Sequence, residues 1–399
     1  MNPLAKLVIA AATSSLVAAA PAQSRTLILL QENSGRSSLT EWMEPQLRTA
    51  AEAIVDQFVE TGEAAKFAQL AQGSYQRFIN LSDGLCTRDN LLNNLIQESL
   101  AGRVVDLCVL GHGAENLLVL HQRPNLTGST IEVIGGTFSR VIVHPGTIRS
   151  MLTDARARHG SGFQFNLRLV YMCNCYGSTL NDDWLAIGAK VSIGSDKNNY
   201  MPEPMLSDFW RRFVKDDHRA GQAAALSYST SRPFWELLVG TQKVQDSQHV
   251  VSGESNLIFR DQCQLAVGQE RTFFVPANQI HSLPQVYLVH GKVYRFTASG
   301  SWRNGMQWYS PPATGANGYT PGLTDFARRV PANMMCLIGE RHARFQSPAS
   351  HVNGSEFQIG VSATITANGH GFLSLYANDA FVGYSDNVGG MTVTVKRMS

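Results

Sequence analysis

The sequence contains little cysteine, no long basic run and no pair of metal-binding cysteine motifs. Six cysteines in 399 residues are too few for a disulfide scaffold, although one or two bridges stay open. Cys173 and Cys175 form C-x-C, and no second pair follows, so we expect no zinc site. The longest basic runs are pairs such as Arg211-Arg212 and the net charge is only +2, which argues against nucleic acid as a partner.

Signs of disorder are also missing. The chain is 44% apolar and 16% charged, with 15 prolines, and it has no low-complexity linker or acidic tail, a composition typical of a globular protein. A length of 399 residues exceeds one typical domain and predicts two.

The first residues suggest export. Lys6 precedes a mostly apolar run from Leu7 to Ala20, and Ala20-Pro21-Ala22 supplies the small residues that a signal peptidase recognises. We interpret residues 1–22 as a signal peptide; a short buried helix is the alternative. No later stretch is long and uncharged enough to span a membrane. We therefore expect a secreted or periplasmic protein with no membrane span.

Strands and helices alternate through the first two thirds of the chain. The apolar pattern predicts strands at 26–31, 104–110, 167–172 and 189–193. It predicts helices at 42–59, 91–100 and 206–214, and one within 142–158. Such alternation indicates an α/β domain with a doubly wound sheet. We assign residues 23–255 to this domain.

From about Leu265 onward the pattern changes to short β-like runs. We expect strands at 286–289, 292–297, 360–365, 371–376 and 391–395. Turn-like clusters occur at 299–302, 314–318 and 384–387. This spacing predicts an all-β sandwich or jelly roll, which we assign to residues 268–399.

Two predicted strands end in residues that suit nucleophilic catalysis. The strand at 104–110 is followed by His112-Gly113, and the strand at 167–172 leads to Cys175. Chemistry gathers at the carboxyl ends of parallel strands, and an imidazole can activate a thiol. Gly113 leaves a backbone N–H accessible to an oxyanion, and Gly177 permits a tight turn. We therefore take His112 and Cys175 as a candidate catalytic dyad.

These residues resemble the caspase-like cysteine peptidases (clan CD). The shared features are His112-Gly113, the segment 174–177 where many members have Ala-Cys-x-Gly, and 188–194, which is similar to the next family strand. The resemblance covers about residues 25–240. It implies that Cys175 attacks a peptide carbonyl, that His112 protonates the leaving amine, and that the N–H groups of Gly113 and Cys175 hold the oxyanion. A protein or peptide would then be the substrate.

Departures from the family pattern leave alternatives open. Asn174 replaces a small alanine, and Cys173 is a second thiol that could act as nucleophile, although only Cys175 is followed by x-Gly. His112 could instead be a hydrogen-bonded core histidine and Cys175 an inert buried thiol. The rival interpretation of the whole chain is a carbohydrate-binding protein whose α/β half is catalytically inactive.

Three acidic residues follow the key strands. Asp182, Asp183 and Asp196 could select a basic residue at the cleaved bond. Asp182 and Asp183 could equally begin a helix, where carboxylates favour the positive end of the dipole. The sequence leaves both interpretations open.

The last fifty residues contain a candidate calcium loop. Asp379, Asp386 and Asn387, with the Gly383 carbonyl between them, offer the hard oxygen ligands that calcium prefers. The alternative is a solvated Asp/Asn/Gly turn that holds no metal.

This loop resembles that of the small calcium-dependent galactose-binding lectins of bacteria. Further similarities lie at 300–302 and 334–339, so the resemblance spans about residues 268–399. It implies a calcium ion and a galactose-like glycan as ligands, although the sugar-contacting His and Gln of the family have no clear counterpart. Taken together, the sequence predicts a secreted cysteine endopeptidase that is tethered by a calcium- and carbohydrate-binding domain.

Overall fold

The computed structural model describes residues 24–31, 61–121, 140–143, 145–305, 314–320, 330–345, 347–379 and 383–399. Its contacts divide the chain into two compact units, Gln23–Asp261 and one that includes Gln262–Ser399, and each is described by itself. The expected signal peptide at 1–22 and the expected helix at 42–59 lie outside the described residues.

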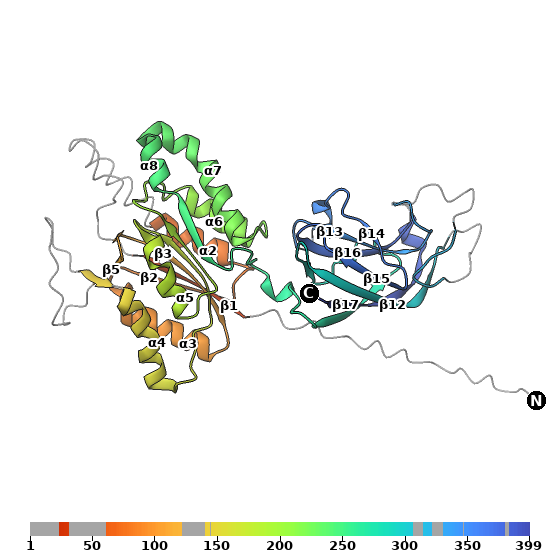
Figure 1. The fold of residues 1–399 in the computed structure, drawn as a ribbon, viewed down its shortest axis with the longest axis horizontal. Helices are drawn as coiled ribbons and strands as arrows, with labels where there is room; N and C mark the ends of the chain where they lie inside the picture. Colours follow the sequence, from red (N-terminus) through yellow and green to blue (C-terminus); the bar gives the residue numbers. More distant parts are fainter. Residues whose placement is uncertain are drawn as a thin grey trace, which may run out of the picture. The chain divides into compact units, whose positions relative to one another are not determined.

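A six-stranded sheet forms the centre of the first unit (Figure 1). Its spatial order is β2-β1-β3-β7-β8-β9, which places the second strand outside the first as in doubly wound sheets. The first five strands are parallel, and β9 runs antiparallel to β8. The bounds are β1 Arg25–Gln31, β2 Arg77–Ser82, β3 Val104–Leu110, β7 Leu167–Cys173, β8 Val191–Ser195 and β9 His249–Gly253.

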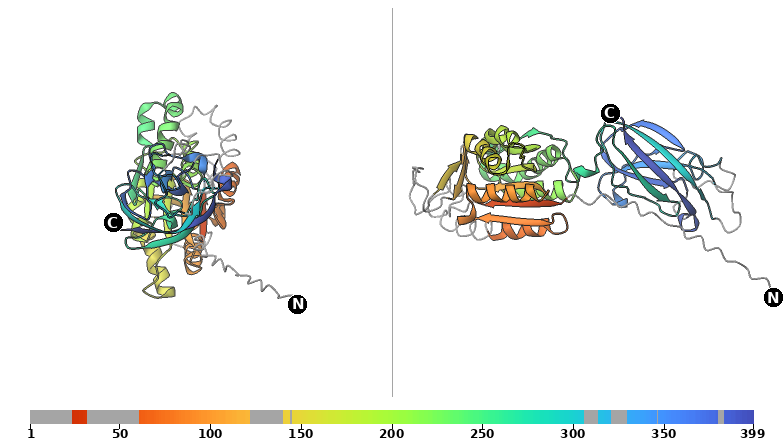
Figure 2. Two further views of the ribbon diagram at one scale, coloured as in Figure 1. Left: turned by 90° about the vertical axis from the view of Figure 1, so that its right-hand side faces the viewer. Right: turned by 90° about the horizontal axis from the view of Figure 1, so that it is seen from below.

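Helices cover both faces of this sheet, as Figures 1 and 2 show. On one face Leu95, Ile148 and Trp184 share a buried apolar cluster with strand residues such as Val170. On the other face the helices contribute side chains such as Phe209 to a second cluster. The helices of the first face are α3 (Arg88–Leu100), α4 (Pro145–His159) and α5 (Asn181–Ala186); those of the second are α2 (Thr61–Ala71), α6 (Met205–Val214) and α7 (Ala220–Val239), with α8 (Thr241–Asp246) after them. Because both faces are covered, the central strands are mostly apolar, and their charged residues Asp106 and Arg168 form a buried ion pair.

A small antiparallel sheet follows β3 directly. It consists of β4 (Gly113–Ala114), β5 (Leu117–His121) and β6 (Arg140–Val143). The backbone N–H of Val119 donates to the carbonyl oxygen of His112 at 3.0 Å. The chain therefore turns back immediately after the first predicted site residues, a feature that the sequence pattern did not predict.

The second unit contains two four-stranded antiparallel sheets, ordered β10-β17-β12-β15 and β11-β16-β13-β14. Buried side chains from both sheets, such as Phe296 and Leu375, form one shared core. The strands are β10 Glu270–Pro276, β11 Tyr287–Leu288, β12 Val293–Arg303, β13 Leu337–His342, β14 Phe357–Gln358, β15 Ser362–Thr366, β16 Gly371–Ala377 and β17 Val388–Arg397.

The prediction of a turn at 299–302 is wrong, because this segment lies inside β12. The strand stays paired with β17 as far as Arg303, which lies opposite Val388. Gly300 has a φ of +124°, and a Cβ there would lie 2.6 Å from the carbonyl oxygen of Gly390. The glycine therefore allows the backbones of two strands to approach closely. In the sequence alone, such a glycine cannot be distinguished from a glycine in a turn.

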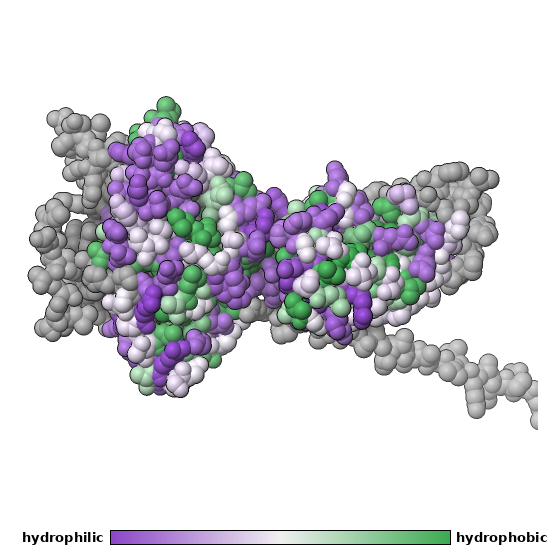
Figure 3. Space-filling model, in the orientation of Figure 1, coloured by the Kyte–Doolittle hydropathy of each residue, from purple (hydrophilic) through white to green (hydrophobic). Residues whose placement is uncertain are grey.

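An apolar group is exposed on α7 of the first unit. Phe234, Leu237 and Leu238 are exposed there, and Figure 3 shows hydrophobic atoms at the upper end of the unit, where α7 and α8 lie. In the part of the chain that the structure describes, no helix is both long and apolar enough to cross a membrane.

Candidate functional site

The pairing of β3 with β7 brings the ends of these two strands to the same level. The strands are parallel, and their last paired residues are Leu110 and Cys173. His112 is the second residue after Leu110, and Cys175 is the second after Cys173. Both site residues therefore leave the sheet at its carboxyl edge from neighbouring strands, where catalytic groups gather in such sheets.

Gly113 is the point at which the two segments meet. A Cβ on this residue would lie 2.3 Å from Nδ2 of Asn174 and 2.6 Å from the carbonyl oxygen of Cys175. Side-chain carbon atoms do not approach other atoms that closely, so only glycine fits between the segments. The structure thus brings His112-Gly113 against Asn174-Cys175.

The hairpin after His112 is fastened to the segment after Cys175. The backbone N–H of Asn116 donates to Oγ1 of Thr179 at 2.8 Å. Oγ1 of Thr179 in turn donates to the carbonyl oxygen of Tyr176 at 2.7 Å. These bonds hold the β4–β5 hairpin next to the turn that carries Cys175.

Cys175 sits on a strained turn and is half-buried. The backbone N–H of Asn199 points at its Sγ at 3.4 Å. Tyr176, the next residue, has φ 55° and ψ 25°, a left-handed conformation that is uncommon for residues other than glycine. Its N–H donates to the carbonyl oxygen of Lys197 at 2.6 Å. Local strain of this kind persists where surrounding contacts enforce it and occurs often at functional sites.

Two glycines allow the turn after Cys175 to pack against β8. A Cβ on Gly194 would lie 2.3 Å from the carbonyl carbon of Gly177, and one on Gly177 would lie 3.2 Å from Cα of Gly194. The two backbones are therefore in direct contact. This contact explains why glycine stands at both 177 and 194.

Cys173 and Cys108 are buried within the sheet. Burial raises the pKa of both thiols well above the ordinary value. The sulfur of Cys173 accepts from Nδ2 of Asn199 at 3.4 Å. Such thiols are poor nucleophiles, because the thiolate is the reactive form. Of the two thiols in the C-x-C segment, Cys175 is the less buried one.

Asn174 fixes the backbone on either side of the candidate nucleophile. Its Nδ2 donates to the carbonyl oxygen of Cys175 at 3.0 Å, and its own carbonyl oxygen accepts from Oγ of Ser195 at 2.6 Å. The side chain is buried, and no hydrogen-bond partner for its Oδ1 occurs among the described residues. The departure from the small alanine of the caspase-like pattern thus adds one hydrogen bond at the site, from Nδ2 to the Cys175 carbonyl oxygen.

The three acidic residues considered for substrate selection differ in position and in exposure. Asp182 and Asp183 fall in the first turn of α5, where carboxylates suit the helix dipole. Asp183 is buried and forms an ion pair with Arg149. Asp196 is exposed after β8, and its N–H donates to the carbonyl oxygen of Gln248 at 2.8 Å. The helix-start interpretation therefore fits both Asp182 and Asp183, and Asp182 and Asp196 are the two carboxylates that are exposed.

The structure brings together part of the predicted calcium loop. Asp379 and Asn387 are buried, and Nδ2 of Asn387 donates to Oδ2 of Asp379 at 2.9 Å. A Cβ on Gly383 would lie 3.0 Å from the same carboxylate oxygen, so the Gly383 backbone lies against it. Asp386 is exposed, in a short 3₁₀ turn.

Asn387 has one polar atom that lacks a partner. Its Oδ1 is buried and has no hydrogen-bond partner in the described part of the chain. Buried polar atoms are almost always paired, so this oxygen could serve a ligand that the described residues do not supply. Asn378, the neighbouring residue, has a structural role instead, because its Nδ2 donates to the carbonyl oxygens of Val330, Ala332 and Asn333.

Asn199 is the site residue that the sequence pattern did not reveal. Its backbone N–H contacts Sγ of Cys175, and its side chain contacts Sγ of Cys173. It lies four residues beyond β8 in an irregular segment. No spacing or composition rule marks such a residue, because its position depends on how the loop after β8 folds back over β7.

Comparisons with known proteins give distant similarities. No family model matches the chain, and no curated protein matches it. Among solved structures, a PllA-like lectin, the EclA N-terminal domain, is 21% identical over 32% of this chain and 94% of its own, with a TM-score of 0.24. The Arg-specific cysteine proteinase gingipain R is 10% identical, with 94% of this chain and 66% of that chain covered and a TM-score of 0.36. IMPa from Pseudomonas aeruginosa, in complex with an O-glycopeptide, is 11% identical over 35% of this chain and 13% of its own, with a TM-score of 0.18. The chain is thus weakly similar to a cysteine proteinase, to a lectin and to a glycopeptide complex, and none of these similarities shows a family.

Proposed function

We propose that the first unit is a caspase-like cysteine endopeptidase with His112 and Cys175 as its catalytic dyad. The observation that carries the proposal is the position of the two residues at the same register beyond β3 and β7, with Gly113 packed against the backbone of Cys175. Two residue types that can form a nucleophile and its acid–base partner thus share one sheet edge. We propose a basic residue before the cleaved bond, with the exposed carboxylates of Asp182 and Asp196 as the candidate partners of its side chain.

The proposed reaction proceeds by acyl transfer. The Cys175 thiolate attacks the peptide carbonyl carbon, the carbon–nitrogen bond breaks, and His112 gives its proton to the leaving amine. Water then attacks the thioester, and its proton returns to His112 as the acid product leaves. The N–H of Asn199, aimed at Sγ, suits a thiolate better than a thiol, because a donor next to sulfur favours negative charge.

Two backbone N–H groups are the proposed oxyanion donors. The N–H of Gly113 and that of Cys175 belong to segments that are in direct contact. Fixed backbone donors stabilise the charge that develops on the carbonyl oxygen, because they need no reorganisation during the reaction. The hairpin bond from Asn116 to Thr179 keeps these segments together.

We propose a calcium ion for the loop of the second unit. The carboxylate of Asp379, the carbonyl oxygen of Gly383 and Oδ1 of Asn387 would serve as ligands, with the exposed carboxylate of Asp386 as a fourth. The buried Oδ1 of Asn387, which lacks a partner in the described residues, fits this assignment because a cation would satisfy it. Bound calcium would present open coordination positions to vicinal sugar hydroxyls, so a galactose-like glycan is the proposed ligand. The second unit would then tether a secreted peptidase to glycans.

A peptide library with a varied residue before the scissile bond tests the peptidase directly. Purified chain, intact and after limited trypsin treatment, is incubated with the library, with Cys175→Ala and His112→Ala as inactive controls. We expect cleavage after arginine or lysine that both substitutions abolish. Turnover by Cys175→Ala would overturn the assignment of the nucleophile.

The rival function is carbohydrate binding with an inactive α/β half. It predicts no turnover with or without calcium, no labelling of Cys175 by a peptidyl electrophile, and retained binding to a galactose matrix in calcium. That combination of results would replace the proposal with the rival. Labelling of Cys175 without peptide turnover would indicate a hydrolase that acts on another acyl substrate.

A further inference from the structure

A second group of titratable side chains lies on β13, far in sequence from the candidate calcium loop. Glu340 and His342 are two residues apart on this strand, so their side chains point to the same face of the sheet. Both are fully buried. Leu337 lies three residues before Glu340 on the same strand, so its side chain points to the opposite face, where it belongs to the apolar core. A carboxylate and an imidazole inside an all-β unit require partners, because burial of unpaired polar groups is costly.

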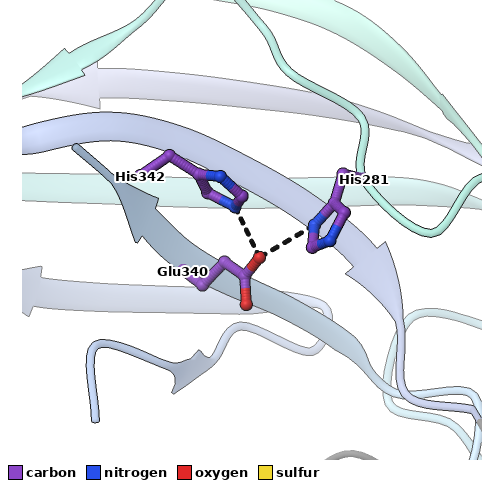
Figure 4. A group of neighbouring side chains, drawn as sticks. All are labelled: His281, Glu340 and His342. Carbon is purple, nitrogen blue, oxygen red and sulfur yellow. Dashed lines mark hydrogen bonds and ion pairs between the residues drawn. The ribbon is translucent and has the colours of Figure 1, made fainter. Parts of the chain in front are cut away.

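A third side chain reaches the same carboxylate from the segment between β10 and β11. Ser282 in this segment exchanges two backbone hydrogen bonds of 2.9 Å with Leu375 of β16, and β16 lies next to β13. His281 is thereby held over Glu340. Its Nδ1 lies 2.9 Å from Oε1 of Glu340, and Nε2 of His342 lies 2.6 Å from the same oxygen (Figure 4).

The backbone determines which nitrogen of His342 carries a proton. Its Nδ1 lies 2.9 Å from the carbonyl oxygen of Ser347, and a carbonyl oxygen only accepts, so Nδ1 must be the donor. In a neutral imidazole Nε2 then has a lone pair, and it faces another acceptor, Oε1 of Glu340, at 2.6 Å. Two acceptors at that separation need a positive centre between them, either a second proton or a metal ion.

We propose that His281, Glu340 and His342 bind a divalent transition-metal ion of the zinc class. The three ligand atoms lie within 4.8 Å of one another. The bond from Nδ1 of His342 to a backbone carbonyl is the arrangement that orients metal-binding histidines, since it leaves Nε2 free to ligate. Two imidazoles and one carboxylate are a common zinc ligand set.

The geometry needs only a small adjustment to hold the ion. Zinc–nitrogen and zinc–oxygen bonds of about 2.0–2.1 Å at tetrahedral angles separate ligand atoms by about 3.3 Å. The observed separations of 2.6 and 2.9 Å from Oε1 would therefore open by roughly half an ångström, which side-chain torsions can supply. Calcium and magnesium do not suit this site, because they prefer oxygen ligands over imidazole.

A fourth group lies against the other oxygen of the same carboxylate. Nδ1 of His351 is 3.2 Å from Oε2 of Glu340, and its Nε2 is 3.3 Å from Oε1 of Glu356. His351 also pairs with His342 through an isolated antiparallel bridge. This ring therefore lies next to Glu340 but outside the group of three ligand atoms proposed for the ion.

The buried position indicates a structural ion. A metal here would connect the segment that carries His281 to β13, and so fix the connection between β10 and β11. Its binding free energy would add to the stability of the second unit, because the unfolded chain offers no assembled site. The inference does not depend on the proposed peptidase, since it uses none of the same residues.

Metal content tests the inference on the full chain, purified without a histidine tag or chelator. We expect about one zinc ion per chain by mass spectrometry of the eluted metal. Cobalt added to protein stripped by a chelator should give the visible absorption of a tetrahedral site. Zinc should also raise the melting temperature of the second unit, whereas the calcium loop should respond to calcium alone.

Two substitutions and one control locate the ion. Glu340→Gln keeps the shape of the side chain but removes its charge and replaces one acceptor oxygen with an amide donor, and we expect zinc content to fall by at least about tenfold. His281→Ala removes a less buried ligand and provides the same readout if Glu340→Gln does not fold. His290→Gln, a change at an exposed histidine of the same unit, should leave zinc content unchanged. Wild-type protein that holds no zinc and gives no cobalt spectrum or thermal shift would overturn the inference and leave a proton between Glu340 and His342.

Discussion

Gly113 leaves no room for a side chain where the segments of His112 and Cys175 meet. In Gly113→Ala the new methyl group would lie 2.3 Å from the Asn174 amide and 2.6 Å from the Cys175 carbonyl, so the two segments must move apart. We expect kcat/KM for the preferred library peptide to fall about 100-fold, the usual cost of a displaced oxyanion donor.

Gly146→Ala is the matched control for this change. A Cβ at Gly146 meets no atom within 4 Å, so activity should stay near that of the wild type. Circular dichroism should be the same for both variants. Equal activity in the two variants would show that the contact around Gly113 has no catalytic importance.

The thiols of the sheet should differ in reactivity. Burial raises the pKa of Cys173 and of Cys108, whereas Cys175 is half-buried and lies beyond the end of β7. Iodoacetamide at neutral pH should therefore label Cys175 and spare the other two, as peptide mapping by mass spectrometry would reveal. In urea all three should react. Faster labelling of Cys173 than of Cys175 in the folded protein would contradict the assignment.

At the scale of single residues the sequence could indicate chemistry but not contacts. His112 and Cys175 are visible as reactive residues at the ends of apolar strands, and the glycines beside them follow from the same pattern. Asn199 could not be found, because its contact with Cys175 depends on a loop between elements. The roles of His112, Gly113 and Cys175, and of the calcium ligands Asp379, Gly383, Asp386 and Asn387, stay predictions.

A buried ion pair connects β3 and β7 within the sheet. Arg168 donates to both carboxylate oxygens of Asp106, through Nε at 2.9 Å and also through a terminal nitrogen. Tyr75 donates to the same carboxylate at 2.8 Å. Burial alone would lower the pKa of Arg168, and the carboxylate of Asp106 more than offsets this, so that the pKa is raised. The pair therefore remains charged inside the core.

Removal of one partner of this pair should be strongly destabilising. Asp106→Ala removes the carboxylate that accepts two of the hydrogen bonds of the buried Arg168 guanidinium and leaves Asp261, at 3.2 Å, as its remaining ion-pair partner; loss of one partner of a buried pair typically costs about 3–5 kcal/mol. Asp154→Ala is the control, because Asp154 pairs with Arg88 at 2.6 Å at the surface and exposed pairs contribute about 0–1 kcal/mol. Urea denaturation measures both changes in the free energy of unfolding. Similar losses for the two variants would show that burial does not make the Asp106–Arg168 pair more important than a surface pair.

His249 on β9 should make the first unit sensitive to acid. Burial lowers its pKa from 6.5 to about 4, and its Nε2 is buried with no hydrogen-bond partner among the described residues. Because the folded pKa lies below the unfolded one, the unfolded chain takes up the proton first. The contribution of His249 to stability is therefore full above pH 6.5 and is lost as the pH falls towards 4.

A comparison with His249→Asn isolates this effect. Between about pH 7 and about pH 5 the wild type should lose about 2 kcal/mol more stability than the variant. Urea denaturation, followed by the transition of the first unit, measures the difference. Parallel pH profiles for the two proteins would show that His249 titrates normally.

At the scale of elements the sequence predicted four of the six strands of the central sheet, β1, β3, β7 and β8, and the helices α3, α4 and α6, but it missed β2, β9, α2, α7 and α8. The strand at 104–110 is confirmed with the same bounds, and the helix expected at 206–214 begins one residue earlier. The hairpin of β4 and β5 was missed because its strands are short. The prediction of a turn at 299–302 was wrong, because the sequence does not distinguish a glycine inside a strand from a glycine in a turn until the partner strand is known.

Each of the two units has a core of its own. Buried clusters on both faces of the six-stranded sheet belong to the first unit, and the shared core of the two antiparallel sheets belongs to the second. Separate cores of this size can unfold separately. We therefore expect two calorimetric transitions for the full chain.

Calcium should raise only the transition of the second unit, because a ligand stabilises the unit that binds it. Asp379→Asn should remove this shift while leaving the first transition unchanged. A single transition that moves as a whole with calcium would show that the two units unfold together.

The amino-acid sequence by itself determined the alternation of strands and helices, the change to β structure near residue 265, and the position of a histidine and a cysteine just beyond two strands. These features follow from hydrophobic periodicity and from local backbone preferences, which are properties of neighbouring residues. Only the tertiary structure decided that His112 and Cys175 share one level of the sheet, that Asn199 contacts the thiol, and that His281 meets Glu340 and His342. Each of these contacts joins segments far apart in the chain. The register of the strands and the path of the loops bring these segments together, and local preferences do not encode either of them.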